Sequence, residues 1–303
     1  MQEVTVTGFG LAGAWVALAL RERGVAVRVV DAGGGSTEVA AGLVNPLAGR
    51  NFEPSRDWDA FWPEALAGYR DLEKASGRRL FYELPILRKW LDAKDRRKFE
   101  KKRDLLTPWL AEVGEEGVVW RGGGWLDTRA FLAAAREVLG EEPFRVGGER
   151  PGLRVFCTGA RGLLAGEYAA GGHRCAKGEI LTLRVPGLRE DRILNGGGWV
   201  IPTGDGLFRA GATYAWDGLE SGPTREGREK VEKMARFLIG ERDFEIVAHV
   251  AGVRPIIHRS EPVIWRDEAG WHLNGLGSKG VIYAPGTARR LVERLVSEGI
   301  LDE

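Results

Sequence analysis

The amino terminus contains the feature that most restricts the fold of this chain, a glycine-rich turn between a strand and a helix. Residues 2–7 alternate toward β-branched side chains and predict a strand. The turn that follows carries Gly8, Gly10 and Gly13 in G-x-G-x-x-G order, and the apolar run after it predicts a helix. A second predicted strand ends in Asp31. This order of elements is the β–α–β opening of a dinucleotide-binding unit.

Each residue of this opening has a physical role in holding a dinucleotide. Gly8 permits the tight turn, Gly10 lets the pyrophosphate approach the backbone, and Gly13 lets the helix pack on the strand. The free N–H groups at the start of the helix attract phosphate, and Asp31 accepts hydrogen bonds from ribose hydroxyls. An acid here disfavours NADP, while the motif alone leaves FAD and NAD open. The expected cofactor contacts in this unit are Gly8, Gly10, Leu11, Ala12, Gly13, Asp31 and Ala32.

Composition excludes several classes of protein. The chain has 303 residues, 44% of them hydrophobic, and a formal net charge of +1. That hydrophobicity excludes intrinsic disorder, and no apolar run is long enough to span a membrane. Cys157 and Cys175 cannot form a disulfide framework, and neither they nor the four histidines have metal-site spacing, so no metal is expected. The amino terminus lacks the pattern of a signal peptide, which predicts a cytoplasmic protein.

The segment 36–50 helps to choose between the nucleotides. It has small residues at Ala40, Ala41 and Gly42, followed by Leu43 and Asn45. This resembles the loop after the second strand in the FAD-dependent D-amino-acid oxidase family, which includes glycine oxidase, sarcosine oxidase and the oxidase domain of the bacterial tRNA-modifying enzyme. The resemblance implies that the cofactor is FAD and that these five residues lie against the flavin. A plain strand-to-helix connection is the alternative.

The carboxy-terminal half carries further parts of the same resemblance. They are a strand with a glycine turn at 155–162, a glycine-containing strand at 177–185, a hairpin at 196–214 with its turn at Asp205-Gly206, the AGVRP motif at 251–255, and a final glycine loop and helix at 273–296. The resemblance is weakest over 52–125, where the chain is short for the family.

The resemblance implies an α/β fold in which a Rossmann-type FAD-binding domain is intertwined with an antiparallel-sheet substrate domain. The FAD-binding domain is expected from 1–50, 126–175 and 264–303, and the substrate domain from 51–125 and 176–263. Amphipathic patterns predict helices over 126–140, near 58–75 and near 224–239.

Two further loops are expected to contact the flavin. Thr158 and Gly159 belong to the strand and glycine turn at 155–162, and the final loop carries Gly277, Ser278, Lys279, Gly280 and Val281. A helix expected to begin around Pro285 and to run to about Ser297 would stabilise negative charge on the reduced ring. The alternative is a glycine loop that only joins a strand to the last helix.

Arg254 is the candidate for substrate binding, because it lies on an otherwise apolar predicted strand and a buried guanidinium needs a partner. In the family, the arginine of this motif holds the substrate carboxylate. The resemblance of the hairpin and of the arginine motif to those of the family also places Trp199 and Tyr214 over the flavin. An internal salt bridge for Arg254, and ordinary core packing for Trp199 and Tyr214, are the alternatives.

The implied chemistry is oxidation of the C–N bond of an amino acid or secondary amine by hydride transfer to flavin N5, with oxygen or another electron acceptor. No residue of the protein is expected to act as a catalytic acid or base. Oxidation of a modified nucleoside in tRNA and non-catalytic nucleotide binding are the alternatives. Residues 94–103 hold seven basic and two acidic side chains, which suits a solvated helix face or a nucleic-acid contact. The near-zero net charge argues against nucleic acid.

Overall fold

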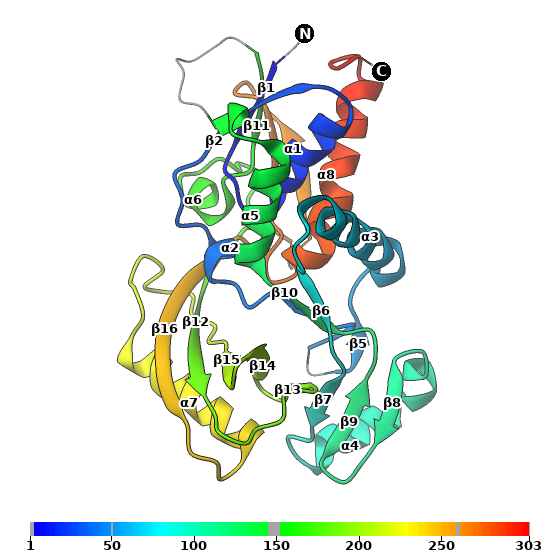
Figure 1. Cartoon of the computed structure of the whole chain (residues 1–303), viewed down its shortest axis with the longest axis vertical. Coiled ribbons are helices and arrows are strands. Elements are labelled where there is room, and N and C mark those ends of the chain that lie inside the picture. Colours follow the sequence, from blue (N-terminus) through cyan, green and yellow to red (C-terminus); the bar gives the residue numbers. More distant parts are fainter. Residues whose placement is uncertain (1–2, 50, 145–151, 259–260, 303) are drawn as a thin grey trace.

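The computed structural model describes residues 3–49, 51–144, 152–258 and 261–302. In Figure 1 the chain forms an upper half that contains both termini and a lower half built around a larger sheet. The chain passes between the halves several times, so each half combines segments that are distant in sequence.

The upper half is built on a five-stranded sheet in the order β17-β18-β11-β1-β2. The strands are β1 (Glu3–Thr7), β2 (Ala26–Val30), β11 (Leu153–Phe156), β17 (Val263–Arg266) and β18 (Trp271–Asn274). Strands β2, β1, β11 and β18 are parallel, and only β17 runs antiparallel to its neighbour. The carboxyl ends of the four parallel strands therefore meet at one edge, which is where ligands bind in sheets of this kind.

Helices pack on this sheet because their apolar faces need cover. Helix α1 is buried along most of its length and packs against α8 and α5, while α3 packs against α8 and α5. One continuous core joins these helices to β1 and β11. The helices of this half are α1 (Leu11–Glu22), α2 (Ser36–Val39), α3 (Trp58–Ser76), α5 (Thr128–Leu139), α6 (Gly159–Leu164) and α8 (Gly280–Ser297), with a 3-10 turn η2 (Glu142–Phe144).

The start of the last helix differs from the sequence expectation. Helix α8 begins at Gly280, so Pro285 lies inside it and not at its first turn. A proline in a helix cannot donate to the carbonyl four residues earlier, here that of Val281. The buried Tyr69 hydroxyl donates to this carbonyl at 2.9 Å. A side chain from α3 therefore satisfies the acceptor that Pro285 leaves free, which lets the helix begin five residues earlier.

The lower half is built on an eight-stranded sheet in the order β16-β12-β15-β14-β13-β7-β9-β8. The predicted hairpin forms, and Asp205 and Gly206 of its turn both have positive φ. Helix α7 covers one face of the sheet. The elements are β7 (Ile86–Lys89), β8 (Leu110–Val113), β9 (Gly117–Trp120), β12 (Ala176–Arg184), β13 (Ile193–Asn195), β14 (Trp199–Gly204), β15 (Leu207–Gly211), β16 (Glu245–Arg254), α4 (Ala93–Glu100), α7 (Arg225–Ile239) and a 3-10 turn η1 (Arg103–Leu106).

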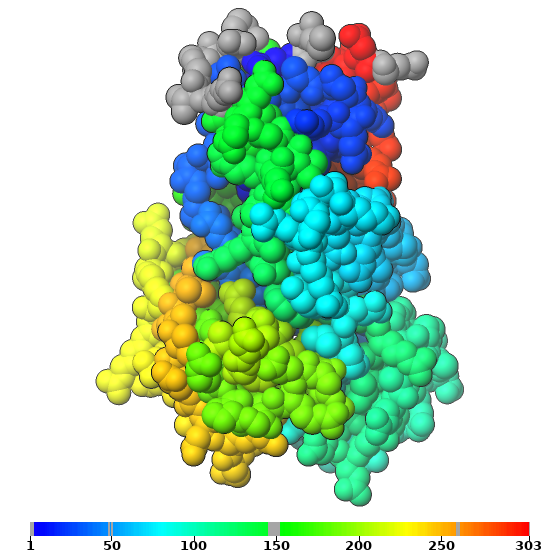
Figure 2. Space-filling model, in the orientation of Figure 1, coloured from blue at the N-terminus to red at the C-terminus, as the bar shows by residue number. Residues whose placement is uncertain are grey.

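Two small sheets lie between these larger ones. The three-stranded sheet has the order β3-β10-β6, and β4 pairs with β5. The strands are β3 (Leu43–Val44), β4 (Leu47–Ala48), β5 (Glu53–Pro54), β6 (Phe81–Glu83) and β10 (Gly124–Leu126). The space-filling view in Figure 2 shows two lobes at the bottom of the molecule, with the β7–β9 and α4 segment in one and the β12–β16 and α7 segments in the other.

The expected helices over 126–140, 58–75 and 224–239 correspond to α5, α3 and α7. The mixed α/β class, with one mostly parallel and one mostly antiparallel sheet, is also as expected. Helix α3 falls within the range that was expected for the substrate domain, yet its apolar face packs on α5 and α8 of the upper half. The division of the chain into two domains stays a prediction, and residues 145–151 within it lie outside the described part of the chain.

Candidate active site

The first predicted loop leaves β1 at the carboxyl edge of the five-stranded sheet, and two of its glycines are required by the protein itself. Gly8 has φ +95°, and a β-carbon there would lie 2.5 Å from the carbonyl oxygen of Cys157. A β-carbon at Gly13 would overlap the carbonyl group of Gly8, which lies directly beneath α1. These two glycines therefore let α1 and β11 pack closely against the turn, whether or not a ligand is bound.

Gly10 differs from its neighbours because its conformation does not require a glycine, although a side chain there would press on Thr37. It has φ −82° and ψ −165°, which any residue adopts, and it is the N-cap of α1. A β-carbon there would meet only the Thr37 hydroxyl, at 3.0 Å. The N–H groups of Ala12 and Gly13 have no acceptor within the helix, because they belong to its first turn. The arrangement leaves these two donors for an anion at the start of α1.

Two side chains complete this first loop. Asp31 directly follows β2, and its Oδ1 accepts a hydrogen bond from the Phe9 N–H at 3.0 Å. Ala32 continues the same loop. The Thr37 hydroxyl accepts from the Leu11 N–H at 3.0 Å, and Thr37 is not among the residues predicted from the sequence. The sequence shows only that Thr37 is a hydroxyl residue in the same segment as Ala40. The fold is needed to see that this hydroxyl reaches the start of α1.

The second predicted loop runs from α2 into β3, and arginines from two other elements fix it. Arg209 of β15 donates to the carbonyls of Val39 and Ala40. Burial lowers the pKa of Arg209 to about 10. Arg129 donates to the carbonyl of Glu38 at 2.9 Å. The lower sheet thus positions a loop of the upper half, a contact that no local sequence signal predicts.

The residues selected in this second loop have different surroundings. A β-carbon at Gly42 would overlap the Leu126 carbonyl, so close packing on β10 explains this glycine. The Asn45 side chain accepts from the Leu47 N–H at 3.0 Å within its own turn. Ala41 is buried and Leu43 is half-buried beside it, in a core cluster that also touches Trp199.

The other two predicted loops lie at the same edge of the sheet. Thr158 follows β11 and donates to Glu167 at 2.5 Å, while the Gly159 carbonyl accepts from Asn274 at 2.9 Å. Among the described residues, and apart from its own chain neighbours and helix backbone, nothing lies within 4 Å of the position that a β-carbon at Gly159 would take. Gly159 therefore faces open space beside the first loop.

The final glycine loop touches both halves of the molecule. The Gly277 N–H donates to the carbonyl of Pro255 at 2.8 Å, and a β-bridge joins Leu276 to Ile256. At its end, Gly280 lies so close to Leu11 that a β-carbon would be 3.1 Å from that side chain. This loop, which includes Ser278 and leads to Val281, therefore lies between the start of α1 and the AGVRP motif. Burial lowers the pKa of Lys279, the N-cap of α8.

Register decides which of the predicted substrate residues meet. Arg254 pairs with Ala176 on β12, and Trp199 pairs with Gly211 on β15. By strand alternation both side chains are on one face of the sheet, but three strand spacings of about 4.8 Å separate them across the sheet. Tyr214 lies beyond the end of β15 and not within it, and the Arg254 guanidinium carbon lies 4.7 Å from its ring centre. The structure therefore brings Arg254 and Tyr214 together and leaves Trp199 farther along the same face.

The surroundings of Arg254 contain no internal salt bridge. Its guanidinium donates to the Thr213 carbonyl at 3.3 Å, and no carboxylate of the described residues lies within ion-pair distance. A β-carbon at Gly178, on the next strand, would overlap the guanidinium, so this glycine makes room for it. The pKa of Arg254 is lowered because burial disfavours the charged guanidinium, and the nearby Tyr214 offsets only part of this effect. A half-buried guanidinium with free donors fits a carboxylate ligand.

These loops meet at the carboxyl edge of the five-stranded sheet, and the last of them bonds to Pro255, the residue after Arg254. The family model for FAD-dependent oxidoreductases matches residues 3–294 of the chain, which is nearly its whole length. The chain belongs to the FAD-dependent oxidoreductase family.

Similar proteins cover the full length of this oxidoreductase. It is 28% identical to a putative thiamine biosynthesis oxidoreductase from Rhizobium etli over 331 residues, which covers 97% of each chain. It is 25% identical to the glycine oxidase of Pseudomonas aeruginosa over 358 residues, with 99% of this chain and 97% of that protein covered.

Solved structures share the fold. Glycine oxidase from Geobacillus kaustophilus superimposes with a TM-score of 0.76 at 18% identity, covering 98% of this chain and 95% of that one. Iminodiacetate oxidase from Chelativorans sp. BNC1 gives a TM-score of 0.73 at 21% identity, with the same two coverages. The FAD-dependent fold expected from the sequence is confirmed.

The residues present fit FAD. The free N–H groups at the start of α1 suit the pyrophosphate, and Asp31, directly after β2, is placed to bind a ribose. The loop around Ala40 is bonded to Arg209 and the loop around Gly277 to Pro255, so both loops contact the lower half. Individual contacts to FAD stay predictions.

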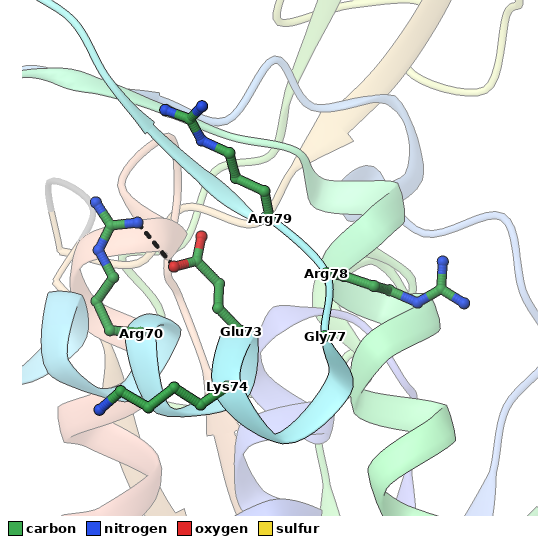
Figure 3. A pocket seen from close by; sticks show the side chains of 6 residues that line it. All are labelled: Arg70, Glu73, Lys74, Gly77, Arg78 and Arg79. Atoms are coloured by element: carbon green, nitrogen blue, oxygen red, sulfur yellow. Dashed lines mark hydrogen bonds and ion pairs between the residues drawn. The ribbon is translucent and has the colours of Figure 1, made fainter.

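Several other polar groups lie outside these loops. A surface hollow, shown in Figure 3, is lined by the end of α3 and the segment that leads to β6: Arg70, Glu73, Lys74, Gly77, Arg78 and Arg79. Arg70 pairs with Glu73 at 2.7 Å, and Arg78 pairs with Glu137 at 3.0 Å. The charges of this hollow are thus largely matched within the protein, and none of its residues belongs to the predicted site.

The basic run 94–103 forms α4 and the start of η1. Phe99 is buried in the core, and Asp95 forms a buried ion pair with Arg88 at 3.0 Å. Lys98 and Lys102 bond to Asn51. In the described part of the chain there is neither a group of side chains suited to a metal ion nor a helix with the length and hydropathy to cross a bilayer.

Proposed function

We propose that this FAD-dependent oxidoreductase oxidises the C–N bond of a small amine that carries a carboxylate. The observation that carries the proposal is Arg254, a half-buried guanidinium without a carboxylate partner among the described residues, on the sheet face beside the final glycine loop. Such a group is costly unless a ligand completes its hydrogen bonds. Relatives named glycine oxidase and iminodiacetate oxidase point to the same substrate class.

In this proposal the protein positions the substrate, and bound FAD supplies the hydride acceptor. The Arg254 fork holds the carboxylate in one orientation, and Tyr214 covers one face of that guanidinium. Trp199 forms an apolar wall farther along the sheet, with its ring over Gly211. The substrate amine must be neutral before oxidation, so activity is expected to rise with pH below the pKa of that amine.

The test is a comparison of Arg254→Met with the wild-type holoenzyme on an amino acid and its decarboxylated analogue. Loss of one partner of a buried charged pair costs about 2–5 kcal/mol, or about 30- to 4000-fold in kcat/KM. That loss is expected for the amino acid, mostly through KM, with little change for the analogue and an unchanged FAD content. Equal losses on both substrates, or release of FAD from the variant, would assign Arg254 to the fold or the cofactor instead.

The finer expectations stay predictions. Oxygen and another carrier both remain open as electron acceptors, and a cytoplasmic location rests on the sequence. The nucleoside alternative has less support, because Lys98 and Lys102 of the basic run already have partners within the protein. Anaerobic bleaching of the flavin by simple amino acids, and not by tRNA, is the expected outcome.

A further inference from the structure

A second unpaired arginine lies near Arg254 on the same side of the lower sheet. Arg174 precedes β12. Its backbone N–H donates to the carbonyl of Ile256, two residues beyond Arg254, at 2.8 Å. Its guanidinium carbon lies 4.0 Å from the ring centre of Trp216. The side chain is exposed, and no carboxylate of the described residues lies within ion-pair distance of it. The nearby acids Asp217 and Glu220 form no ion pair with Arg174 either.

Two aromatic rings connect the arginines. The rings of Tyr214 and Trp216 are in contact, with centres 5.2 Å apart, and Arg254 lies against the first as Arg174 lies against the second. Because each step is a ring contact, the two guanidinium carbons are no more than about 14 Å apart. Tyr214 and Trp216 are 49% and 38% exposed, so this row of side chains is accessible to solvent.

Stacking on a ring leaves the hydrogen-bonding edge of a guanidinium free. An arginine offers five N–H donors in the plane of the group, and ring contact uses only its face. Each carboxylate carbon lies about 4 Å from the guanidinium carbon in a paired fork, so a molecule with two carboxylates a few bonds apart can engage both arginines. A single carboxylate on Arg254 would leave Arg174 without a partner.

We propose that Arg174 is a specificity-determining residue, and that the preferred substrates are amines with a second carboxylate, such as an N-carboxymethyl amino acid. This rests on the proposed function, since Arg254 holds the first carboxylate. Arg174 acts at the second carboxylate only, so it changes affinity for one class of amine and not the oxidation step.

The test measures binding of two non-oxidisable ligands to the holoenzyme through the flavin absorption spectrum. Thiodiacetate has two carboxylates and a sulfur in place of the amine, and (methylthio)acetate has one carboxylate. Arg174→Gln is expected to weaken thiodiacetate by about 3- to 10-fold, as for an exposed charged pair, and (methylthio)acetate by less than twofold. Arg174→Lys should recover part of the loss, and Arg254→Met should weaken both ligands.

The matched control is Arg97→Gln, which removes an exposed arginine of α4 and should change neither affinity. An Arg174→Gln variant that weakens both ligands equally, or neither, overturns the inference. If the wild type binds (methylthio)acetate but does not prefer thiodiacetate, this inference fails and the proposed function stands. If it binds neither ligand and oxidises no carboxylated amine, both fail.

Discussion

Gly10→Ala should remove FAD from this oxidoreductase and leave the fold intact, whereas Gly13→Ala should damage both. Gly10 is the N-cap of α1 in an extended conformation, and its added β-carbon would meet only the Thr37 hydroxyl at 3.0 Å. Alanine is a poorer N-cap than glycine by about 0.5–1 kcal/mol, but it also restricts the unfolded chain, which contributes about 0.4–1 kcal/mol of stability. The net change in the free energy of unfolding is therefore close to zero.

The same substitution affects the ligand far more strongly. The new methyl group would lie at the N-cap of α1, against the Thr37 hydroxyl and next to the N–H groups of Ala12 and Gly13 that we expect to bind the pyrophosphate. Loss of one hydrogen bond to a charged group costs about 1.5–3 kcal/mol, which weakens FAD by at least about tenfold. In Gly13→Ala the β-carbon overlaps the Gly8 carbonyl, so α1 must move away from β1 at a cost of about 1–3 kcal/mol.

The assay compares apoprotein melting temperature with FAD affinity from flavin fluorescence. Gly10→Ala should change the apoprotein Tm by no more than about 4 °C, and Gly13→Ala should lower it by about 2–12 °C. Gly35→Ala is the matched control, because Gly35 is also an extended N-cap, with φ −76° and open space around it. A Gly10→Ala protein that binds FAD like the wild type, or one that is as unstable as Gly13→Ala, would refute the assignment of this space to the cofactor.

Three more changes test the contacts that support the site. Arg209→Met should have a larger effect on FAD binding than on thermal stability. The carbonyls of Val39 and Ala40 lose their donors, while the methionine side chain still fills the space. Unchanged FAD affinity in this variant would contradict the account. Tyr69→Phe leaves the Val281 carbonyl unpaired and should lower the free energy of unfolding by about 1–3 kcal/mol, measured by denaturant unfolding. Adding Pro285→Ala should restore most of that stability, because the alanine supplies an N–H for the same carbonyl. Failure of the second substitution to restore stability would argue against the account of α8. Burial alone would raise the pKa of Glu179, but hydrogen bonds from Thr224 and the ion pair with Lys177 hold it below the ordinary value of 4.5. The ionised carboxylate therefore stabilises the fold fully above about pH 5, and this contribution is lost as the pH falls through the lowered pKa. Glu179→Gln should lower Tm at pH 7 and should make Tm fall less steeply in acid. Parallel Tm profiles of the two proteins would contradict the assignment.

Local signals in the sequence are sufficient for the parts of the fold whose causes are local. The strand, glycine turn and helix at residues 3–22 follow from side-chain period and from the φ that Gly8 requires. The hairpin turn at Asp205 and Gly206 follows from the same kind of local backbone preference. Helix α7 begins after Thr224, which caps it by accepting from the Gly227 N–H, and amphipathic spacing predicts its length. Each of these involves residues within a few positions of one another.

Tertiary structure alone decides which distant residues meet. Sheet register places Arg254 against Tyr214 and leaves Trp199 three strands away, although the sequence treats all three alike. Arg209 reaches Ala40 across 169 positions. Such pairings depend on how whole elements pack, and a residue carries no local mark of its partner in another strand. The amino-acid sequence thus determined the nucleotide-binding unit and the elements around it, while packing between the two sheets determined which side chains face the open site, because contacts between distant segments form only when those elements come together.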